Sequence, residues 1–290
     1  MKKREGGIVD KGFNVFNHVF FVMVSIIMLY PFWYVLMFSI SDPSKSALNS
    51  YYLLPQGFTL DTYRYMLKQT LIYTGYKNTI FVTVVGTAFS LFMTFITAYP
   101  LSQGKLKGKN IILKFIFFTM LFDGGMIPTY IVVRGLGLTN SLWSLIILGC
   151  INVFYLLIMI KFFKGIPSSL IESAKIDGYN DIGILFKIVL PLSGAALSSI
   201  ALFYAVGHWN AFLGPIIYIN DNDKMVLQVV LRSLFKQDTL GNETNISMQI
   251  SSPEHFRMAT IIITILPIVM AYPFIQKYFV KGVTLGSVKG

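Results

Sequence analysis

The chain has 290 residues, of which 54% are hydrophobic and 13% are charged. Soluble domains carry about 25% charged residues, so this composition excludes an ordinary soluble domain and indicates a membrane-embedded protein. The net charge of +11 is dispersed among apolar runs, which favours basic cytosolic loops over nucleic-acid binding. The single cysteine, Cys150, lies in an apolar run, so the chain has no disulfide framework of its own.

Six apolar segments follow one another along the chain, and each is long enough to cross a bilayer core of about 30 Å as a helix. The first follows the basic start MKKREGG but is too long for a signal peptide, so we interpret it as a retained span. We therefore predict an all-α membrane protein with six transmembrane helices in a single domain over residues 1–290. The predicted spans are 16–40, 78–100, 111–133, 142–163, 192–219 and 258–280.

The distribution of Lys and Arg predicts the orientation. With the N-terminus inside, the inner segments 1–15, 100–114, 161–191 and 277–290 hold 15 of these residues, and the outer segments hold 9. Because inner loops of membrane proteins are enriched in Lys and Arg, both termini are predicted to lie inside.

Amphipathic stretches in two outer loops predict short helices at the membrane surface. Tyr63, Met66 and Leu67 share one face at helical spacing, and residues 224–235 show a similar pattern before the sixth span. The glycine pair of FDGGMIP predicts a break in the third span, which a membrane protein tolerates where the backbone faces protein or water.

The segment 164–191, between the fourth and fifth spans, is more charged than its surroundings and predicts a helix–turn–helix. Pro167 suits the first turn of a helix, and the glycine at 178 ends that helix. Asn180 can cap a second helix over 181–190.

The second of these helices carries a predicted apolar stripe. Ile182, Leu185, Phe186 and Val189 recur at the spacing of one helix face. A short segment on the inner surface with such a stripe requires a partner, and insertion of a helix into a groove is the expected mode of recognition.

The same segment resembles a known motif, the EAA loop of ATP-binding-cassette (ABC) importer permeases. The resemblance rests on Glu172-Ser173-Ala174, Gly178 and Ile188-x-Leu190-Pro191. FDGGMIPTYIVVRGLGLTNS, HWNAF and the tail VKGVTLGSVKG extend the resemblance over nearly the whole chain. They are similar to maltose-type carbohydrate uptake permeases of the LplC-like branch, which handles complex oligosaccharides.

The resemblance implies a multi-pass, non-catalytic permease subunit in the bacterial cytoplasmic membrane. It implies a second homologous permease, two ATPase subunits, an extracytoplasmic solute-binding protein and an oligosaccharide substrate, with membrane lipid around the spans and no nucleic acid. ATP and Mg would bind to the ATPase, so no cofactor and no metal site are expected in this chain. ATP-driven closure of the ATPase dimer would move the loop and shift the spans between inward-open and outward-open states.

The resemblance also implies which residues couple to the ATPase, with Glu172 expected to pair with a basic residue of that partner. The expected coupling residues are Glu172, Ser173, Ala174, Asp177, Gly178, Ile182, Phe186, Leu190 and Pro191.

Aromatic and amide side chains within the spans are candidates for the substrate path, because sugar rings present apolar faces and hydroxyl edges. Polar groups inside spans usually face the interior of the bundle. Packing is the alternative interpretation of these side chains, and the second permease could hold most of the sugar contacts. The candidates are Tyr204, His208, Trp209, Asn210, Asn152 and Tyr155.

Two other functions remain open at this point. An EAA loop is also compatible with an importer of a non-sugar solute, such as an amino acid or a metal. An ion-coupled carrier that works alone would need membrane acids, for which Asp123 is the candidate. Residues 104–110, GKLKGKN, differ from a Walker A motif in spacing and in their last residue, so we interpret them as a basic cytosolic hairpin.

Overall fold

The computed structural model describes residues 8–46, 52–104, 106–239, 252 and 254–270. The described part is mostly helical and contains no β-strand beyond one isolated bridge between Ser41 and Phe58. The chain divides into two units, one formed by residues 1–68 and 234–265 and the other by residues 69–233 and 266–290.

In the first unit, one long apolar helix is followed by two short ones, and the helical residues 254–265 belong to the same unit. The helix α1 (Ile8–Ser39) includes a 28-residue candidate span, Gly12–Ser39, none of whose apolar window is buried in the protein. After α2 (Pro43–Ser46), the amphipathic helix α3 (Asp61–Lys68) follows, as predicted.

The predicted apolar face of α3 is only partly correct. Met66 is fully buried, and the Tyr63 hydroxyl lies 2.7 Å from the Ser39 hydroxyl at the end of α1. Leu67, in contrast, is 49% exposed, so it does not share the buried face.

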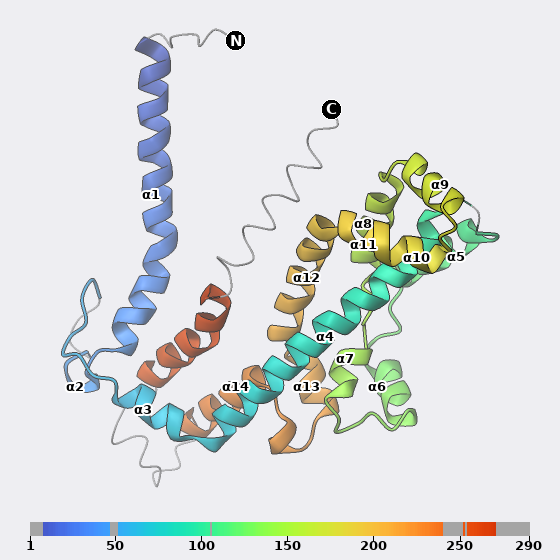
Figure 1. The fold of residues 1–290 in the computed structure, drawn as a ribbon. Coiled ribbons are helices and arrows are strands. Elements are labelled where there is room, and N and C mark those ends of the chain that lie inside the picture. Colours follow the sequence, from blue (N-terminus) through green and yellow to red (C-terminus); the bar gives the residue numbers. More distant parts are fainter. Residues whose placement is uncertain (1–7, 47–51, 105, 240–251, 253, 271–290) are drawn as a thin grey trace. The chain divides into compact units, whose positions relative to one another are not determined.

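The second unit is built around one continuous helix. The helix α4 (Thr70–Ser102) has 33 residues and lies along α12 (Gly194–Trp209) and α8 (Val153–Lys164), as Figure 1 shows. It begins eight residues before the predicted span because the stretch after Gln69 continues the same helix.

Small and hydroxyl-bearing residues allow these helices to approach closely. A Cβ atom at Gly86 would lie 2.8 Å from Nε2 of His208, so only glycine fits opposite this ring. Gly86 on α4 and His208 on α12 therefore mark a close contact between the two helices, and a small residue at such a contact is typical of helix packing in membranes.

Three of the predicted spans are not straight helices. The third consists of α5 (Lys109–Leu121) and α6 (Met126–Gly135), which meet at 115°. The predicted glycine break is confirmed: Gly125 has φ +84°, and its N–H donates to Oδ1 of Asp123 at 3.0 Å.

The fourth and fifth predicted spans are interrupted as well. Residues 148–152 separate α7 (Trp143–Ile147) from α8, and residues 210–212 separate α12 from α13 (Leu213–Tyr218). By length and composition, two straight helices could each cross a membrane, and three bent pairs could do so as well. The described part of the predicted sixth span is helical, and its residues 271–280 lie outside the described residues.

The start of α4 is fixed to a distant loop. The Asn78 side chain donates to the backbone oxygens of Asp223 and Met225, both at 2.9 Å, next to the 3₁₀ turn η2 (Asn222–Lys224). The Thr79 hydroxyl accepts from the N–H of Leu227, the first residue of α14 (Leu227–Thr239). The predicted amphipathic helix over 224–235 is thus confirmed, with its start at 227.

Candidate functional site

We call the segment 164–193 the elbow. It begins with a short helix whose C-terminus is capped by a glycine. The helix α9 is Ser168–Ile176. The N–H of Tyr179 donates to the oxygen of Ala174, and the N–H of Gly178 donates to the oxygen of Lys175. This pair of bonds is a Schellman motif, which requires a left-handed residue, and Gly178 supplies it with φ +83°.

The second arm of the elbow is not one α-helix, contrary to the prediction over 181–190. Asn180 caps α10 (Asp181–Ile184) by accepting from the Gly183 N–H at 2.7 Å, as predicted. The backbone then widens into a π-turn, η1 (Leu185–Val189), before α11 (Leu190–Leu192). Pro191 has no N–H to donate one turn back, and its ring would clash there, so the wider turn relieves the conflict.

The elbow joins the fifth span at a sharp bend. The helical segment 181–192 and α12 meet at 81°. Ser193, at the bend, is fully buried, and its hydroxyl donates to the backbone oxygen of Val189 at 2.6 Å. The same oxygen also accepts from the Ser193 N–H at 3.0 Å, so both donors of Ser193 bond to the turn that precedes the bend.

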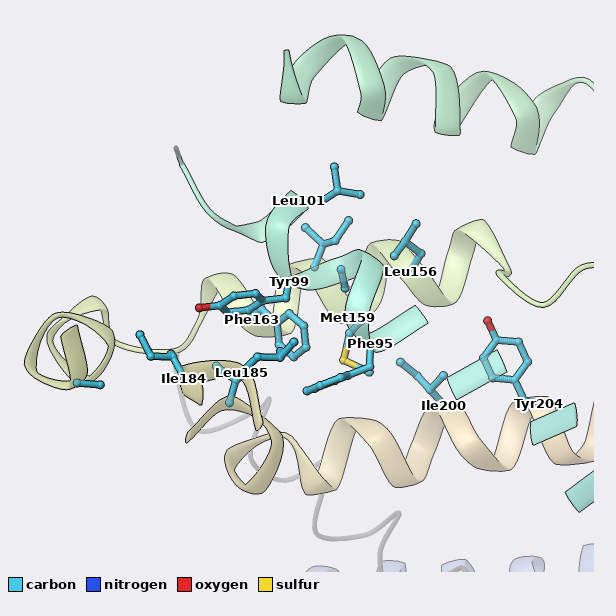
Figure 2. Packing of buried hydrophobic residues seen from close by; sticks show 14 residues of the cluster. Phe95, Tyr99, Leu101, Leu156, Met159, Phe163, Ile184, Leu185, Ile200 and Tyr204 are labelled. Carbon is cyan, nitrogen blue, oxygen red and sulfur yellow. The ribbon is translucent and has the colours of Figure 1, made fainter. Parts of the chain in front are cut away.

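One face of the elbow is embedded in the core of the second unit. Figure 2 shows Ile184 and Leu185 beside Phe163 of α8 and Tyr99 of α4. The Phe95 ring on α4 packs edge-on against Phe163 at 5.5 Å between centroids. The elbow residues buried in this cluster are Ala174, Ile184, Leu185 and Val189.

The opposite face is exposed and apolar, and it corrects the predicted stripe. Leu185 and Val189 point into the core, whereas Ile182 is 68% exposed and Phe186 is 42% exposed. The predicted stripe is therefore divided between two faces. Ile176, at the end of α9, is 85% exposed and adds to the outer face.

Charged side chains surround this apolar surface. Nζ of Lys175 lies 3.0 Å from Oδ1 of Asp181, so an ion pair joins α9 to α10 across the turn. Nζ of Lys187 lies 4.9 Å from the centroid of the Tyr179 ring. Glu172 is exposed on α9, where its carboxylate is accessible to a partner protein.

The structure brings eight of the nine expected coupling residues to the surface of the elbow. Ala174 differs, because it is 3% exposed and packs into the core cluster. A small residue is needed there to let α9 approach the spans. The eight exposed residues are Glu172, Ser173, Asp177, Gly178, Ile182, Phe186, Leu190 and Pro191.

A second feature, which we call the aromatic cavity, has a volume of about 610 Å³. Its walls come from α4, α8, α12 and the helical residues Pro267 and Ile268, and its lining is almost entirely apolar. The lining residues are Thr83, Tyr155, Leu202, Phe203, Ala205, Val206, Gly207, Trp209, Pro267 and Ile268.

Two of the six predicted substrate-path residues, Tyr155 and Trp209, line the aromatic cavity. Tyr155 stacks on Phe203 at 5.6 Å between centroids with an interplanar angle of 15°. The Trp209 ring lies 6.5 Å from the Tyr76 ring. Flat rings at the wall of a cavity of this size can support the apolar face of a sugar.

The other four candidates do not line this cavity. The Tyr204 hydroxyl accepts from the Asn152 N–H at 2.9 Å and lies 2.7 Å from the Thr94 hydroxyl. The Asn152 side chain caps α8 by accepting from the N–H groups of Phe154 and Tyr155. His208 packs against Gly86, and the exposed Asn210 donates to the backbone oxygen of Val206.

Sequence reasoning missed Thr83, whose hydroxyl is buried at the cavity and has no hydrogen-bond partner within the described part of the chain. Polar or small residues recur every three or four positions along α4, at Thr79, Thr83, Gly86, Ser90 and Thr94. That spacing marks one face of the helix and could have identified this residue.

Neither a metal cluster nor a membrane acid emerges as a site. The described residues hold no group of three His, Cys, Asp or Glu side chains that could bind a metal ion. Asp123 is exposed and holds the turn between α5 and α6.

Comparison with known proteins supplies the biological context of this geometry. No protein-family model matches the chain. It is 44% identical over 281 residues to the polygalacturonan/rhamnogalacturonan transport system permease protein YtcP of Bacillus subtilis (strain 168), covering 96% of this chain and 98% of that protein. It is also 44% identical over 280 residues to Protein LplC of the same organism, covering 96% of this chain and 95% of that one.

A solved structure agrees with these relatives. The chain matches, with a TM-score of 0.85 and 31% identity, a crystal structure of a bacterial ABC transporter involved in the import of the acidic polysaccharide alginate. The match covers 96% of this chain and 100% of the matched chain.

Proposed function

Because the chain belongs to the permease subunits of ABC importers for oligosaccharides, we propose that its elbow is the surface through which a separate ATPase drives transport. The single observation that carries this proposal is the two-sided construction of the elbow. Its inner face is buried with α4, α8 and α12, and its outer face presents apolar side chains ringed by charge.

A rigid connection is what such a coupling element requires. A force on α9 or α10 reaches the spans through the packed side chains of Ala174, Ile184 and Leu185. Close-packed interiors transmit displacement because they contain few voids in which side chains could yield. The outer side chains, with Ile182 and Phe186 among them, are available to fill a groove of the ATPase.

The proposal extends to the assembly. A second homologous permease would complete the translocation path, two ATPase subunits would bind ATP and Mg, and an extracytoplasmic binding protein would deliver the sugar. The chain would cross the bacterial cytoplasmic membrane six times with both termini inside, so that the elbow and the basic hairpin 104–110 would lie in the cytosol. The membrane subunit would then hold no cofactor.

The substrate proposed for the complex is an oligosaccharide, and acidic ones are the first to test. One relative is named for polygalacturonan and rhamnogalacturonan, and the matched structure concerns alginate. The ten residues that line the aromatic cavity carry no charge, so this wall suits sugar ring faces. Any carboxylate on the sugar would have to be recognised by other residues or by the second permease.

Charge reversal at the elbow tests the coupling role. Glu172→Lys is expected to abolish sugar uptake and sugar-stimulated ATP hydrolysis while the permease pair still assembles, because an exposed charge contributes little to folding. Asp223→Lys is the matched control, since this residue is also exposed but lies in η2. Normal uptake by the Glu172→Lys transporter would refute the coupling role of this residue.

The substrate is tested separately. Calorimetry of the cognate binding protein against neutral and acidic oligosaccharides should show tight binding to one class, and uptake by the assembled transporter should follow the same preference. Binding restricted to amino acids or metal ions would contradict the proposed substrate.

A further inference from the structure

The start of α5 and the end of α8 lie near α9 in the second unit (Figure 1). A basic hollow lies between them. It has a volume of about 490 Å³ and is formed where Gly104, Leu106 and Gly108 and the start of α5 meet the end of α8. The residues that line it are Gly104, Leu106, Gly108, Lys109, Asn110, Ile111, Leu113 and Lys164. None of the roles proposed above involves this hollow.

The polar lining is made of donors. Two lysines and one asparagine amide reach the hollow, and no Asp or Glu lines it. Ion pairs among the described residues join Arg64 to Asp61, Lys175 to Asp181 and Lys224 to Asp221, so neither lining lysine is neutralised by a carboxylate there. The hollow therefore concentrates positive charge.

Lys109 is held in place at the edge of the hollow. Its Nζ donates to the backbone oxygens of Ser102 at 3.2 Å and Gln103 at 2.9 Å, at the end of α4. An ammonium group has three donors, so one remains for a ligand. Fixing the side chain in this way also reduces the conformational entropy that ligand binding would cost.

The surroundings of the hollow change from basic to apolar within one turn. Its wall includes Ile111 and Leu113, and α5 continues with the exposed side chains of Phe115 and Phe118. In a membrane protein, exposed apolar side chains of this kind face acyl chains, and lysines at the end of the helix lie at headgroup level. The ligand should therefore combine a negative charge with an apolar tail.

We propose that this hollow binds the phosphate of an anionic phospholipid headgroup from the inner leaflet, with Lys109, Lys164 and Asn110 as donors. Basic pockets between transmembrane helices on the cytoplasmic side are suited to such headgroups. Because Lys164 is both the last residue of α8 and the first residue of the elbow, the bound lipid would hold the end of α8 against the start of α5. Lipid binding at this place is independent of the sugar that the transporter carries.

The test compares lipids retained by the assembled transporter, purified from mixed phosphatidylglycerol and phosphatidylcholine and examined by native mass spectrometry. The wild type should retain phosphatidylglycerol in preference. Lys164→Gln should lower that retention about fivefold, because it removes one of the two lysine donors that line the hollow. Lys161→Gln is the matched control, because this lysine is exposed on the same helix but does not line the hollow, and it should change retention by less than about twofold.

Inorganic phosphate separates the two possible sources of the anion. If free phosphate displaces phosphatidylglycerol and binds equally well, the hollow is a site for soluble anions and the lipid proposal is wrong. Equal retention of both lipids, or equal losses in the two variants, would also overturn it. Sugar-stimulated ATP hydrolysis, measured on the same samples, reports on the proposed transport function independently of lipid retention.

Discussion

The elbow and the aromatic cavity lie in the same unit of the chain, yet they are built in opposite ways. In the elbow, inward and outward side chains alternate within one continuous segment, so Ile184 is fully buried while Ile182 is 68% exposed. In the aromatic cavity, the lining comes from helices far apart in sequence, and the hydroxyl of Tyr204 is used to hold those helices together. A motif within one segment can be predicted from the sequence, whereas a cavity depends on how separate helices pack against one another.

The largest effect is expected from alanine substitutions at two isoleucines of the elbow, one buried and one exposed. Ile184→Ala removes a fully buried side chain and should lower the free energy of unfolding by about 3 kcal/mol. Ile182→Ala removes an exposed one and should change it by less than about 0.5 kcal/mol, while weakening co-purification of the ATPase. Thermal unfolding in detergent and pull-down of the ATPase measure the two effects. Equal destabilisation by both variants would contradict the two-sided elbow.

A smaller effect is expected at Tyr204. This residue was predicted to contact the sugar, but in the structure its hydroxyl bonds to other residues of the protein. Tyr204→Phe leaves the Asn152 N–H and the buried Thr94 hydroxyl without this partner, which should cost about 2 kcal/mol of stability. Tyr155→Phe is the control, because it preserves the stack on Phe203 and should leave stability unchanged. If Tyr204→Phe altered sugar selectivity without changing stability, the result would support the original prediction that this tyrosine contacts the sugar.

The cap of α9 provides a test of local backbone geometry. Gly178→Ala places a side chain on a residue with φ +83° and should destabilise the elbow by about 1–2 kcal/mol, although no atom lies within 4 Å of the new Cβ. Gly194→Ala also meets open space but lies in the first turn of α12, where alanine is favoured, so it should be neutral or stabilising. Hydrogen exchange of the elbow and thermal unfolding would report the difference, and identical behaviour of the two variants would contradict the cap.

The smallest expected effect concerns the residue that the sequence did not reveal. Thr83→Val keeps the shape of the side chain but removes a hydroxyl from the aromatic cavity, so the apparent sugar affinity in uptake should fall about threefold. Thr87→Val is the matched control, since its hydroxyl is also buried on α4 but does not line the cavity. Unchanged uptake by Thr83→Val would make this threonine a packing residue.

The features of the elbow that depend on neighbouring residues could be predicted from the sequence. A glycine-terminated first helix, the cap at Asn180 and a helix–turn–helix were all predicted, because each depends on neighbours within a few residues. The π-turn was not predicted, since periodicity describes Leu185 and Val189 equally well on an ideal α-helix. The coupling roles of the exposed residues stay a prediction.

Sequence by itself determined that this protein is helical and membrane-embedded, and its motifs identified the family, because composition, apolar run length and short motifs are properties of contiguous residues. Tertiary structure decided where the fourth and fifth spans are interrupted, which face of the elbow is buried, and that Tyr155, Trp209 and Thr83 share one cavity. These features arise from packing between helices that are distant in sequence, such as the contact of α4 with α12 at Gly86 and His208. A pattern of neighbouring residues cannot predict such a contact.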